Sequence, residues 1–428
     1  MLETLKNAWK IEELRKKILF TLLIILLYRL GNAIPVPYVN VAALQAYFNS
    51  LQNTVLGLLN VMSGGAFSQA TIFALSIQPY INASIIIQLL CIAIPALERM
   101  SKDEGEEGRK KIASITRYAT VAIGLLQGFG FYMLIKNYGI LTAEAEGNVW
   151  AAIVIILTFT SGSALIMWLG EQITEFGIGN GISMILFASI ISRFPTAIIT
   201  SISNIIRGQL QWWVALLMFL GALAIVILIV YVNDAERRIP VQYAKRVVGR
   251  KMYGGQSTYL PMKVNMSGVM PIIFAQSIAS VPATIAAFTG KTSGWVNTWF
   301  GTNSIPYAII YLLLIIFFAY FYSTIQFNPV EVANNLKKNG GYIPGFRPGK
   351  PTSEFIQKVL NKITLFGALY LGVIAVTPIL ISHFSNAAAL TGLSLGGTSI
   401  IIVVGVALET IRALEAQMLM RNYKGFLD

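Results

Sequence analysis

Long apolar runs dominate the pattern of hydrophobic and polar positions along the chain. Charged residues are missing from stretches as long as 30–97 and 363–408, and a helix that crosses the hydrocarbon core of a bilayer needs about 20 apolar residues. Clusters of Gly, Pro, Asn and Ser divide the longest stretches. The pattern predicts ten membrane-spanning helices, at about 18–34, 72–95, 115–136, 150–170, 182–200, 212–232, 269–288, 306–327, 363–383 and 396–413.

The composition agrees with lipid as the surrounding solvent. Of the 428 residues, 55% are hydrophobic and 12% are charged, and the mean hydropathy is +0.66, whereas soluble domains are about 25% charged. The chain has one cysteine, Cys91, and one histidine, His383. It therefore forms no intrachain disulfide, and it offers neither a cysteine–histidine metal cluster nor several candidates for histidine-based catalysis. We expect no metal and no cofactor.

The first apolar run has the basic residues Arg15, Lys16 and Lys17 before it, as a cleaved signal peptide would. However, Arg29 interrupts the run, no clear cleavage site between small residues follows, and nine more predicted spans come after it. We therefore interpret the run as the first membrane span, preceded by an amphipathic segment over 1–17.

The basic residues give the spans an orientation. With ten spans, both ends of the chain lie on one side, and that side receives 27 of the 32 Lys and Arg residues. Because cytoplasmic loops carry the excess of Lys and Arg in membrane proteins, we expect both termini, the loops 233–268 and 328–362 and the tail 414–428 to be cytoplasmic. The net charge of +13 then follows from topology and needs no nucleic-acid partner.

Residues 53–71 are apolar, but they are too few and too small to span a membrane. Gly57, Ser63, Gly64 and Gly65 interrupt them, and irregular backbone at membrane depth must be buried in protein or line a wet cavity. The pattern favours a half-inserted segment before the second span. An ordinary external loop with an amphipathic helix is the alternative.

The loop 233–268 is too regular for a linker. Its segments 239–248 and 256–266 have the β-branched and aromatic residues of strands, with GRKMYGG between them as the turn. This pattern predicts a β-hairpin with the basic residues Arg246, Arg250 and Lys251 near its tip. A basic, projecting tip suits the docking of an acidic partner or RNA, although the positive-inside rule by itself also accounts for the charge.

The loop 328–362 also has predicted order. Asn328 is a good N-cap before Pro329, and Gly340 with Gly341 would end the helix that follows. The sequence GYIPGFRPGKPT comes next, in which prolines and glycines fix irregular backbone around Arg347, and Thr352 or Ser353 would cap a further short helix. An arginine in such a frame suits bidentate recognition of carboxylate or phosphate. A structural arginine that binds loop carbonyls fits the residues equally well.

Polar residues within the predicted spans are mostly neutral amides and hydroxyls, such as Gln78, Gln88 and Gln276, which more often join helices than transport a substrate. A secondary transporter with broken helices is the alternative class, but ion-coupled transporters usually carry intramembrane carboxylates, and the span centres lack them. An intramembrane enzyme lacks a candidate dyad. The chain also has no GxxxxGK[ST] phosphate loop for ATP hydrolysis.

Several long motifs resemble the SecY/Sec61-alpha family, whose bacterial members are channel subunits of the general secretory translocase. The motifs are SGGAFSQATI (63–72), FALSIQPYINASIIIQLL (73–90), GIGNGISMILF (177–187), YLPMKVNMSGVMPIIFA (259–275), YIPGFRPGKPT (342–352) and LGGTSIIIVVGVALET (395–410). The resemblance covers the whole chain. It implies an all-α multipass membrane protein with ten transmembrane helices in two pseudo-symmetric five-helix halves, 18–207 and 208–413, that close like a clamshell.

The resemblance also implies a pore with two barriers. Its constriction would be a ring of apolar side chains, in which Leu186 stands where the family usually has isoleucine: Ile77, Ile81, Ile182, Leu186, Ile273 and Ile402. The second barrier would be a plug at about 57–69, made of Gly57, Leu58, Leu59, Asn60, Val61, Met62, Ser63, Gly64, Gly65, Ala66, Phe67, Ser68 and Gln69. A lateral gate would lie between the second and third spans on one side and the seventh and eighth on the other.

As a function, the resemblance implies a protein-conducting channel and not an enzyme. It would translocate unfolded secretory polypeptides and release signal sequences and transmembrane segments sideways into membrane lipid. The implied partners are the membrane subunits SecE and SecG, the secretory preproteins, and the SecA ATPase or the ribosome, which would dock at Arg246, Arg250, Lys251 and Arg347. The expected location is the bacterial plasma membrane, with both termini cytoplasmic.

Overall fold

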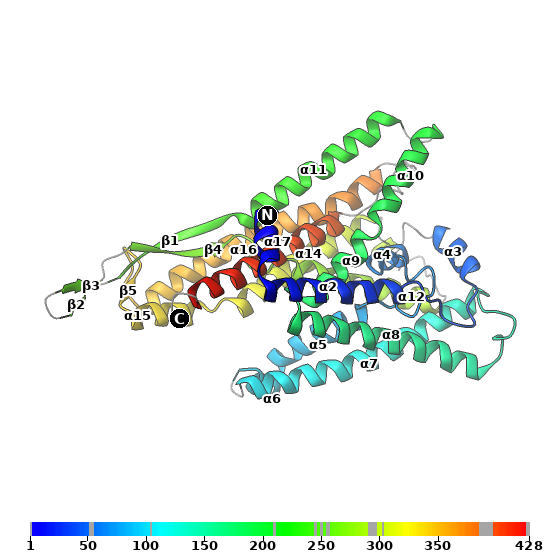
Figure 1. Cartoon of the computed structure of the whole chain (residues 1–428), viewed down its shortest axis with the longest axis horizontal. Helices are drawn as coiled ribbons and strands as arrows, with labels where there is room; N and C mark the ends of the chain where they lie inside the picture. The colour runs from blue at the N-terminus through cyan, green and yellow to red at the C-terminus, as the bar shows by residue number, and fades with distance from the viewer. Residues whose placement is uncertain are drawn as a thin grey trace.

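Most of the helices run roughly along one long axis (Figure 1). The computed structural model describes residues 2–50, 55–102, 105–208, 211–243, 246–248, 251–253, 257–289, 298–301, 304–384 and 397–424. Its named helices are α1 Leu2–Lys10, α2 Glu12–Gly31, α3 Val41–Ser50, α4 Val55–Met62, α5 Gln78–Ala93, α6 Pro95–Lys102, α7 Gly105–Asn137, α8 Val149–Phe176, α9 Gly181–Ile191, α10 Phe194–Ile206, α11 Trp212–Asp234, α12 Met270–Thr289, α14 Ile305–Gln326, α15 Pro329–Lys338, α16 Lys350–Phe384 and α17 Gly397–Lys424. Its strands are β1 Glu236–Tyr243, β2 Arg246–Val248, β3 Lys251–Tyr253, β4 Ser257–Lys263 and β5 Gly341–Tyr342.

Each of the ten predicted spans coincides with at least one helix, but not every helix is long and apolar enough to cross a membrane. Within the described ranges six helical stretches meet that condition, or seven if the bent pair α5–α6 forms one span: Gly105–Asn137, Val149–Phe176, Gly181–Ile206, Trp212–Asp234, Ile305–Lys338 and Lys350–Leu380. By contrast, α2 has basic residues near both of its ends, and the apolar part of α12 is shorter. The structure is that of a helical multipass membrane protein.

The helix of the second predicted span is shorter than the sequence suggests. The span was expected over 72–95, but α5 begins at Gln78, and residues 63–77 form turns, with one β-bridge residue at Thr71. At its other end α5 stops before Pro95, which forces the preceding residue, Ile94, out of the helical region. The axis bends there by 106° into α6.

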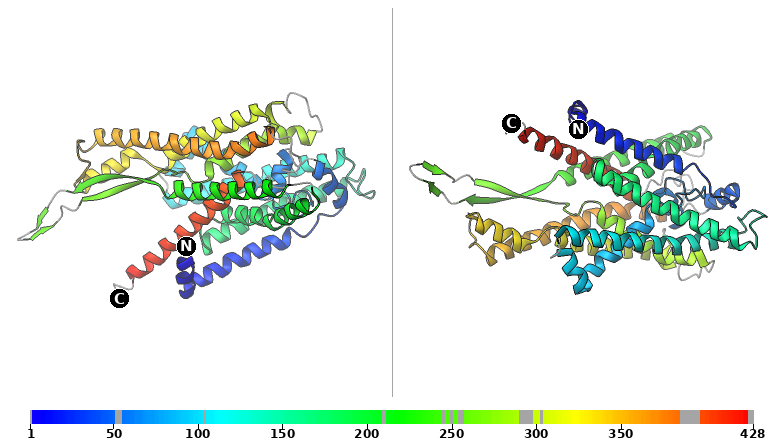
Figure 2. Two further views of the ribbon diagram at one scale, coloured as in Figure 1. Left: turned by 90° about the horizontal axis from the view of Figure 1, so that it is seen from above. Right: turned by 60° about the horizontal axis from the view of Figure 1, so that its bottom comes forward.

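Two small antiparallel sheets confirm the predicted hairpin and correct its turn. In the first sheet the strand order is β4-β1-β5, and Ile239 of β1 pairs with Leu260 of β4. The second sheet joins β2 to β3, with Val248 opposite Lys251. The segment GRKMYGG is therefore not one turn, because Lys251–Tyr253 within it is a strand. Figures 1 and 2 show the sheets projecting beyond one end of the helices.

The loop between α14 and α16 packs against this sheet. α15 begins as predicted, because the Asn328 side chain accepts hydrogen bonds from the backbone N–H groups of Val330 and Glu331. After it, β5 adds to the edge of β1, and apolar side chains close a separate small core around Ile239, Val241, Met262, Ile343, Ile356 and Leu360. Within the described range 304–384, no short second helix follows α15. Instead α16 runs without a break for 35 residues from Lys350.

Candidate pore, plug and docking surface

The six residues of the predicted constriction come from four helices and belong to one apolar cluster. Ile77 and Ile81 lie at the start of α5, Ile182 and Leu186 on α9, Ile273 on α12 and Ile402 on α17. Five of them are buried members of the largest hydrophobic cluster in the described residues, and Ile182 is half-buried against it. The structure therefore places all six in or against the same cluster, which also contains many other packing residues from most of the helices.

The close approach of α9 to α8 positions Ile182 and Leu186. A Cβ atom at Gly181 would lie 1.9 Å from the carbonyl oxygen of Gly170, so only glycine fits there. Asn180 caps the helix, because its side-chain oxygen accepts hydrogen bonds from the N–H groups of Ile182 and Ser183. These features place the first turn of α9 directly on α8, with its isoleucine against the central cluster.

The predicted plug consists of α4 and the turn-rich segment that follows it. Gly57, Met62, Ser63, Ala66 and Phe67 are buried, Asn60, Val61, Gly64, Gly65 and Ser68 are half-buried, and Gln69 is exposed. The side chains of Leu58 and Leu59 lie outside the described part. Met62 packs into the central cluster, whereas Phe67 stacks on Phe131 of α7 with ring centroids 4.2 Å apart. This irregular backbone is packed within protein, which is what a half-inserted segment requires.

Contacts with α9 and with the residues between α9 and α10 hold the plug segment in place. Arg193, between α9 and α10, donates a hydrogen bond from Nη1 to the carbonyl oxygen of Asn60 at 3.2 Å. Gly64 adopts a φ of 69°, and a Cβ atom there would lie 3.0 Å from the carbonyl oxygen of Ser189. Arg193 belongs to none of the sequence motifs described above. Its role at the plug could not be found from spacing, because 133 residues separate it from Asn60.

Side-chain hydrogen bonds connect α5 to α12 and α14. Ser277 of α12 donates to Oε1 of Gln78 at 3.4 Å, and Tyr322 of α14 donates to Oε1 of Gln88. We call this line of contacts between α5 and the pair α12–α14 the seam. The seam joins α5, which lies within 18–207, to α12 and α14, which lie within 208–413. Separating these two parts of the chain at the seam would break both hydrogen bonds.

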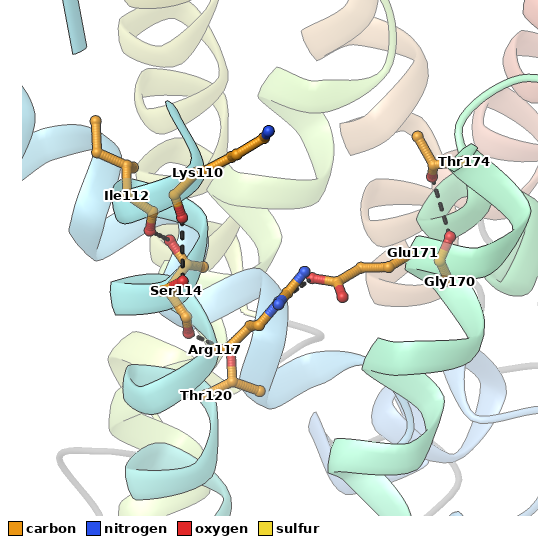
Figure 3. Close-up of polar contacts among 9 residues, drawn as sticks. Lys110, Ile112, Ser114, Arg117, Thr120, Gly170, Glu171 and Thr174 are labelled. Carbon is orange, nitrogen blue, oxygen red and sulfur yellow. Dashed lines mark hydrogen bonds and ion pairs between the residues drawn. The ribbon is translucent and has the colours of Figure 1, made fainter. Parts of the chain in front are cut away.

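Figure 3 shows an ion pair that joins α7 to α8. Nε of Arg117 lies 2.9 Å from Oε1 of Glu171, and the two side chains are 52% and 24% exposed. Thr174, on the next turn of α8, donates to the carbonyl oxygen of Gly170. The pair therefore ties two neighbouring helices on a partly solvated surface.

The predicted docking residues differ in how far the structure describes them. Arg347 is exposed in the turn between β5 and α16; its carbonyl oxygen accepts a hydrogen bond from Thr352 at 2.8 Å, and the neighbouring Phe346 stacks on Phe355. Within the described ranges no hydrogen bond or ion pair involves the Arg347 guanidinium. The structure places Arg246 in β2 and Lys251 in β3 without describing their side chains, and Arg250 lies outside the described residues.

The part of the chain that the structure describes contains no candidate metal site. No group of three or more His, Cys, Asp or Glu side chains gathers there in a way that could hold an ion. The candidate site combines the apolar residues predicted to form the constriction, a largely buried irregular segment and an exposed loop that carries Arg347.

Comparison with known proteins identifies the family. The SecY family profile matches residues 71–411. The chain is 45% identical to the "Protein translocase subunit SecY" of Streptomyces scabiei and 43% identical to that of Mycobacterium bovis, each over the full length of both chains. Among solved structures, "The structure of a protein conducting channel" is 17% identical with a TM-score of 0.66, covering 94% of this chain and 92% of the other.

The fold and the site define a multipass membrane channel. The matches to translocase subunits over the whole chain make the assignment more specific: the chain belongs to the SecY family, and it is a protein-conducting translocation channel and not an enzyme. Membership of this family removes the secondary transporter as an alternative.

Proposed function

We propose that the chain conducts unfolded secretory polypeptides across the bacterial plasma membrane through the constriction formed by Ile77, Ile81, Ile182, Leu186, Ile273 and Ile402. The observation that supports the proposal is that these six residues, from four helices, all lie in or against one apolar cluster. We call this flexible ring of six apolar residues the collar. It offers no specific hydrogen bond to a passing peptide, and it dewets when empty. It can therefore pass any sequence while excluding ions at rest.

The plug, about 57–69, is the second barrier of the idle channel. Its burial between the central cluster and α7 supports this role, and a similar solved structure is described by the words "The plug domain of the SecY protein stablizes the closed state of the translocation channel and maintains a membrane seal". That structure is 18% identical, with a TM-score of 0.66. Opening of the seam would release signal sequences and transmembrane segments sideways, because an apolar helix is stable in lipid.

The proposed architecture has ten spans in two halves, 18–207 and 208–413, with both termini and the sheet end of the molecule in the cytoplasm. The excess of Lys and Arg in the loops 233–268 and 328–362 supports this orientation. Reporter domains fused after Asp428 and within 244–255 should read cytoplasmic, and one within 142–148 external. An external reading from the hairpin fusion would overturn the orientation.

The proposed partners are the membrane subunits SecE and SecG, the SecA ATPase, the ribosome and secretory preproteins. The exposed Arg347 in its rigid turn and the projecting basic hairpin support docking at the cytoplasmic end. A solved relative described as "Sec61 in the Canine ribosome-channel complex from the endoplasmic reticulum" has the same fold, with a TM-score of 0.63. The ATPase would supply the energy that the chain itself cannot obtain from a nucleotide.

Single-channel conductance in planar bilayers tests the constriction. Replacing several collar residues by Gly or Ser exposes the layer to water, because apolar surface loses roughly 25 cal/mol for each Å² that becomes wet, and we expect ion leakage at rest. Matched changes at Ile155, which is buried away from the central cluster, and at Ile227, which is exposed, serve as controls. If the collar variants stay tight, or the controls leak as much, these side chains are ordinary packing and not a pore.

A further inference from the structure

The sulfur atom of Met62 lies where the plug meets the seam. It accepts a hydrogen bond from Nε2 of Gln276 on α12 at 3.4 Å and a second, longer one from Nε2 of Gln78 on α5 at 3.7 Å. Ser277, next to Gln276, closes the arrangement by donating to Oε1 of Gln78. One plug residue therefore touches both sides of the seam through polar contacts in an otherwise apolar cluster.

Burial of Met62 and Gln276 increases the free-energy cost of losing these weak hydrogen bonds. Met62 is 3% exposed and Gln276 is 3% exposed, so water does not replace the sulfur as a partner for the Gln276 amide, whereas Gln78 is half-buried. A thioether is a weak acceptor, but a buried N–H with no acceptor at all costs free energy. Oε1 of Gln276 already has no partner in the described residues, so the closed arrangement is satisfied only in part and depends on the sulfur.

The geometry links departure of the plug to separation of α5 from α12. If the plug leaves, Gln78 and Gln276 both lose their shared acceptor, and the seam loses a tie. If α5 and α12 separate, the sulfur cannot serve both amides, and the plug loses one of its holds. A coupling of this kind is reciprocal, because each event lowers the free-energy cost of the other by the same amount.

We propose that Met62 is the positioning residue that couples plug displacement to opening of the seam, through its thioether between Gln78 and Gln276. The inference rests on the proposed plug and collar. A methionine suits this place because it is unbranched and apolar enough to lie within the cluster, yet it accepts hydrogen bonds that leucine cannot. The strength of this tie sets how readily a signal sequence opens the channel.

The test compares Met62→Leu, Gln276→Met and the double variant in planar bilayers, with the amount of protein in the membrane measured for each. Met62→Leu keeps the side-chain volume and removes the acceptor. We expect resting conductance to rise about fivefold, which corresponds to roughly 1 kcal/mol because a tenfold change is 1.4 kcal/mol. Gln276→Met removes a donor from the other side and gives the same test if Met62→Leu does not accumulate. Because both act on one contact, the double variant should leak less than the product of the single effects.

Met184→Leu is the matched control. Its sulfur accepts a hydrogen bond from Thr410 between α9 and α17, at 3.4 Å and away from the seam, so its conductance should equal that of the unchanged channel. Deletion of 60–68 tests the plug separately from the coupling through Met62. Leakage from the deletion without leakage from Met62→Leu overturns the coupling and leaves the plug in place, whereas tightness of both overturns the plug itself. Independent, multiplying effects, or an equally leaky Met184→Leu, also overturn the coupling.

Discussion

The hydroxyl of Tyr322 on α14 donates a hydrogen bond to Oε1 of Gln88 on α5, across 234 residues of sequence. Gln88 is itself held in place, because its Nε2 donates to the hydroxyl of Ser84 one turn earlier at 3.2 Å. Gln88 lies near the end of α5 that leads into α6, whereas Gln78, in the other tie, lies at its start. The seam is thus held at two levels by separate side chains.

Tyr322→Phe should loosen the seam at this level. A net intramolecular hydrogen bond contributes about 1 kcal/mol, so we expect about a fivefold gain in export of a preprotein with a weakened signal sequence. Tyr320→Phe is the control, because Tyr320 bonds to the carbonyl oxygen of Asn361 on α16, away from the seam. Equal export from both variants would contradict a gating role for Tyr322.

Gly162→Ala should disturb the segment that leads into α5. A Cβ atom at Gly162 would lie 1.9 Å from the carbonyl oxygen of Ile72, which is backbone and cannot turn aside. We expect a loss of roughly 2 kcal/mol of stability, in the range of overpacked sites, seen as a lower unfolding temperature in detergent. Gly221→Ala, which meets nothing within 4 Å on α11, should be neutral or slightly stabilising. An unchanged unfolding temperature for Gly162→Ala would show that this packing is looser than described.

Arg347→Glu should impair docking without unfolding the channel. The side chain is exposed, and the turn is held by the carbonyl oxygen of Arg347 and by the stack of Phe346 on Phe355, neither of which the substitution removes. We expect at least a tenfold loss of affinity for ribosomes in co-sedimentation and slower SecA-driven translocation. Lys358→Glu changes the charge of another exposed residue, on α16, and should have a much smaller effect. Normal binding by Arg347→Glu would remove this arginine from the docking surface.

Exchanging the charges of Arg117 and Glu171 tests the ion pair between α7 and α8. Each single reversal, Arg117→Glu or Glu171→Arg, places like charges together and should cost about 1 kcal/mol, because half-exposed pairs contribute little more. The double exchange should recover most of that loss in thermal unfolding. A double exchange that stays as unstable as the single reversals would show that the pair does not stabilise the contact between α7 and α8.

Sequence patterns predicted where helices lie better than where they end. Apolar runs identify the part of a helix in lipid, so α7 and α8 extend beyond their predicted spans through polar residues such as Glu106 and Glu171. The strand β5 has only two residues, Gly341 and Tyr342, and it exists because β1 offers it an edge. No local signal can predict such a pairing.

Only part of the candidate site could be predicted from the sequence, because contacts between distant residues have no local signal. The family motifs pointed to the collar residues, and the structure places those residues in one cluster. The contacts of Arg193 with Asn60 and of Met62 with Gln276 join positions 133 and 214 residues apart. They depend on how α4 enters between α9 and α12, and that packing is a property of the folded chain.

If it tilts as one body, the helix α16, which is continuous and has Pro378 near its C-terminal end, is a lever arm. At about 1.5 Å per residue, its 35 residues give a rod of roughly 52 Å. A tilt of about 10° around Phe384 would move the end beside Arg347 by roughly 9 Å and the level of Thr364 by roughly 5 Å. Thr364 is hydrogen-bonded to Ser323, the neighbour of Tyr322. A push on the basic turn would then be transmitted, reduced by about half, to the level of Ser323, next to the bond between Tyr322 and Gln88.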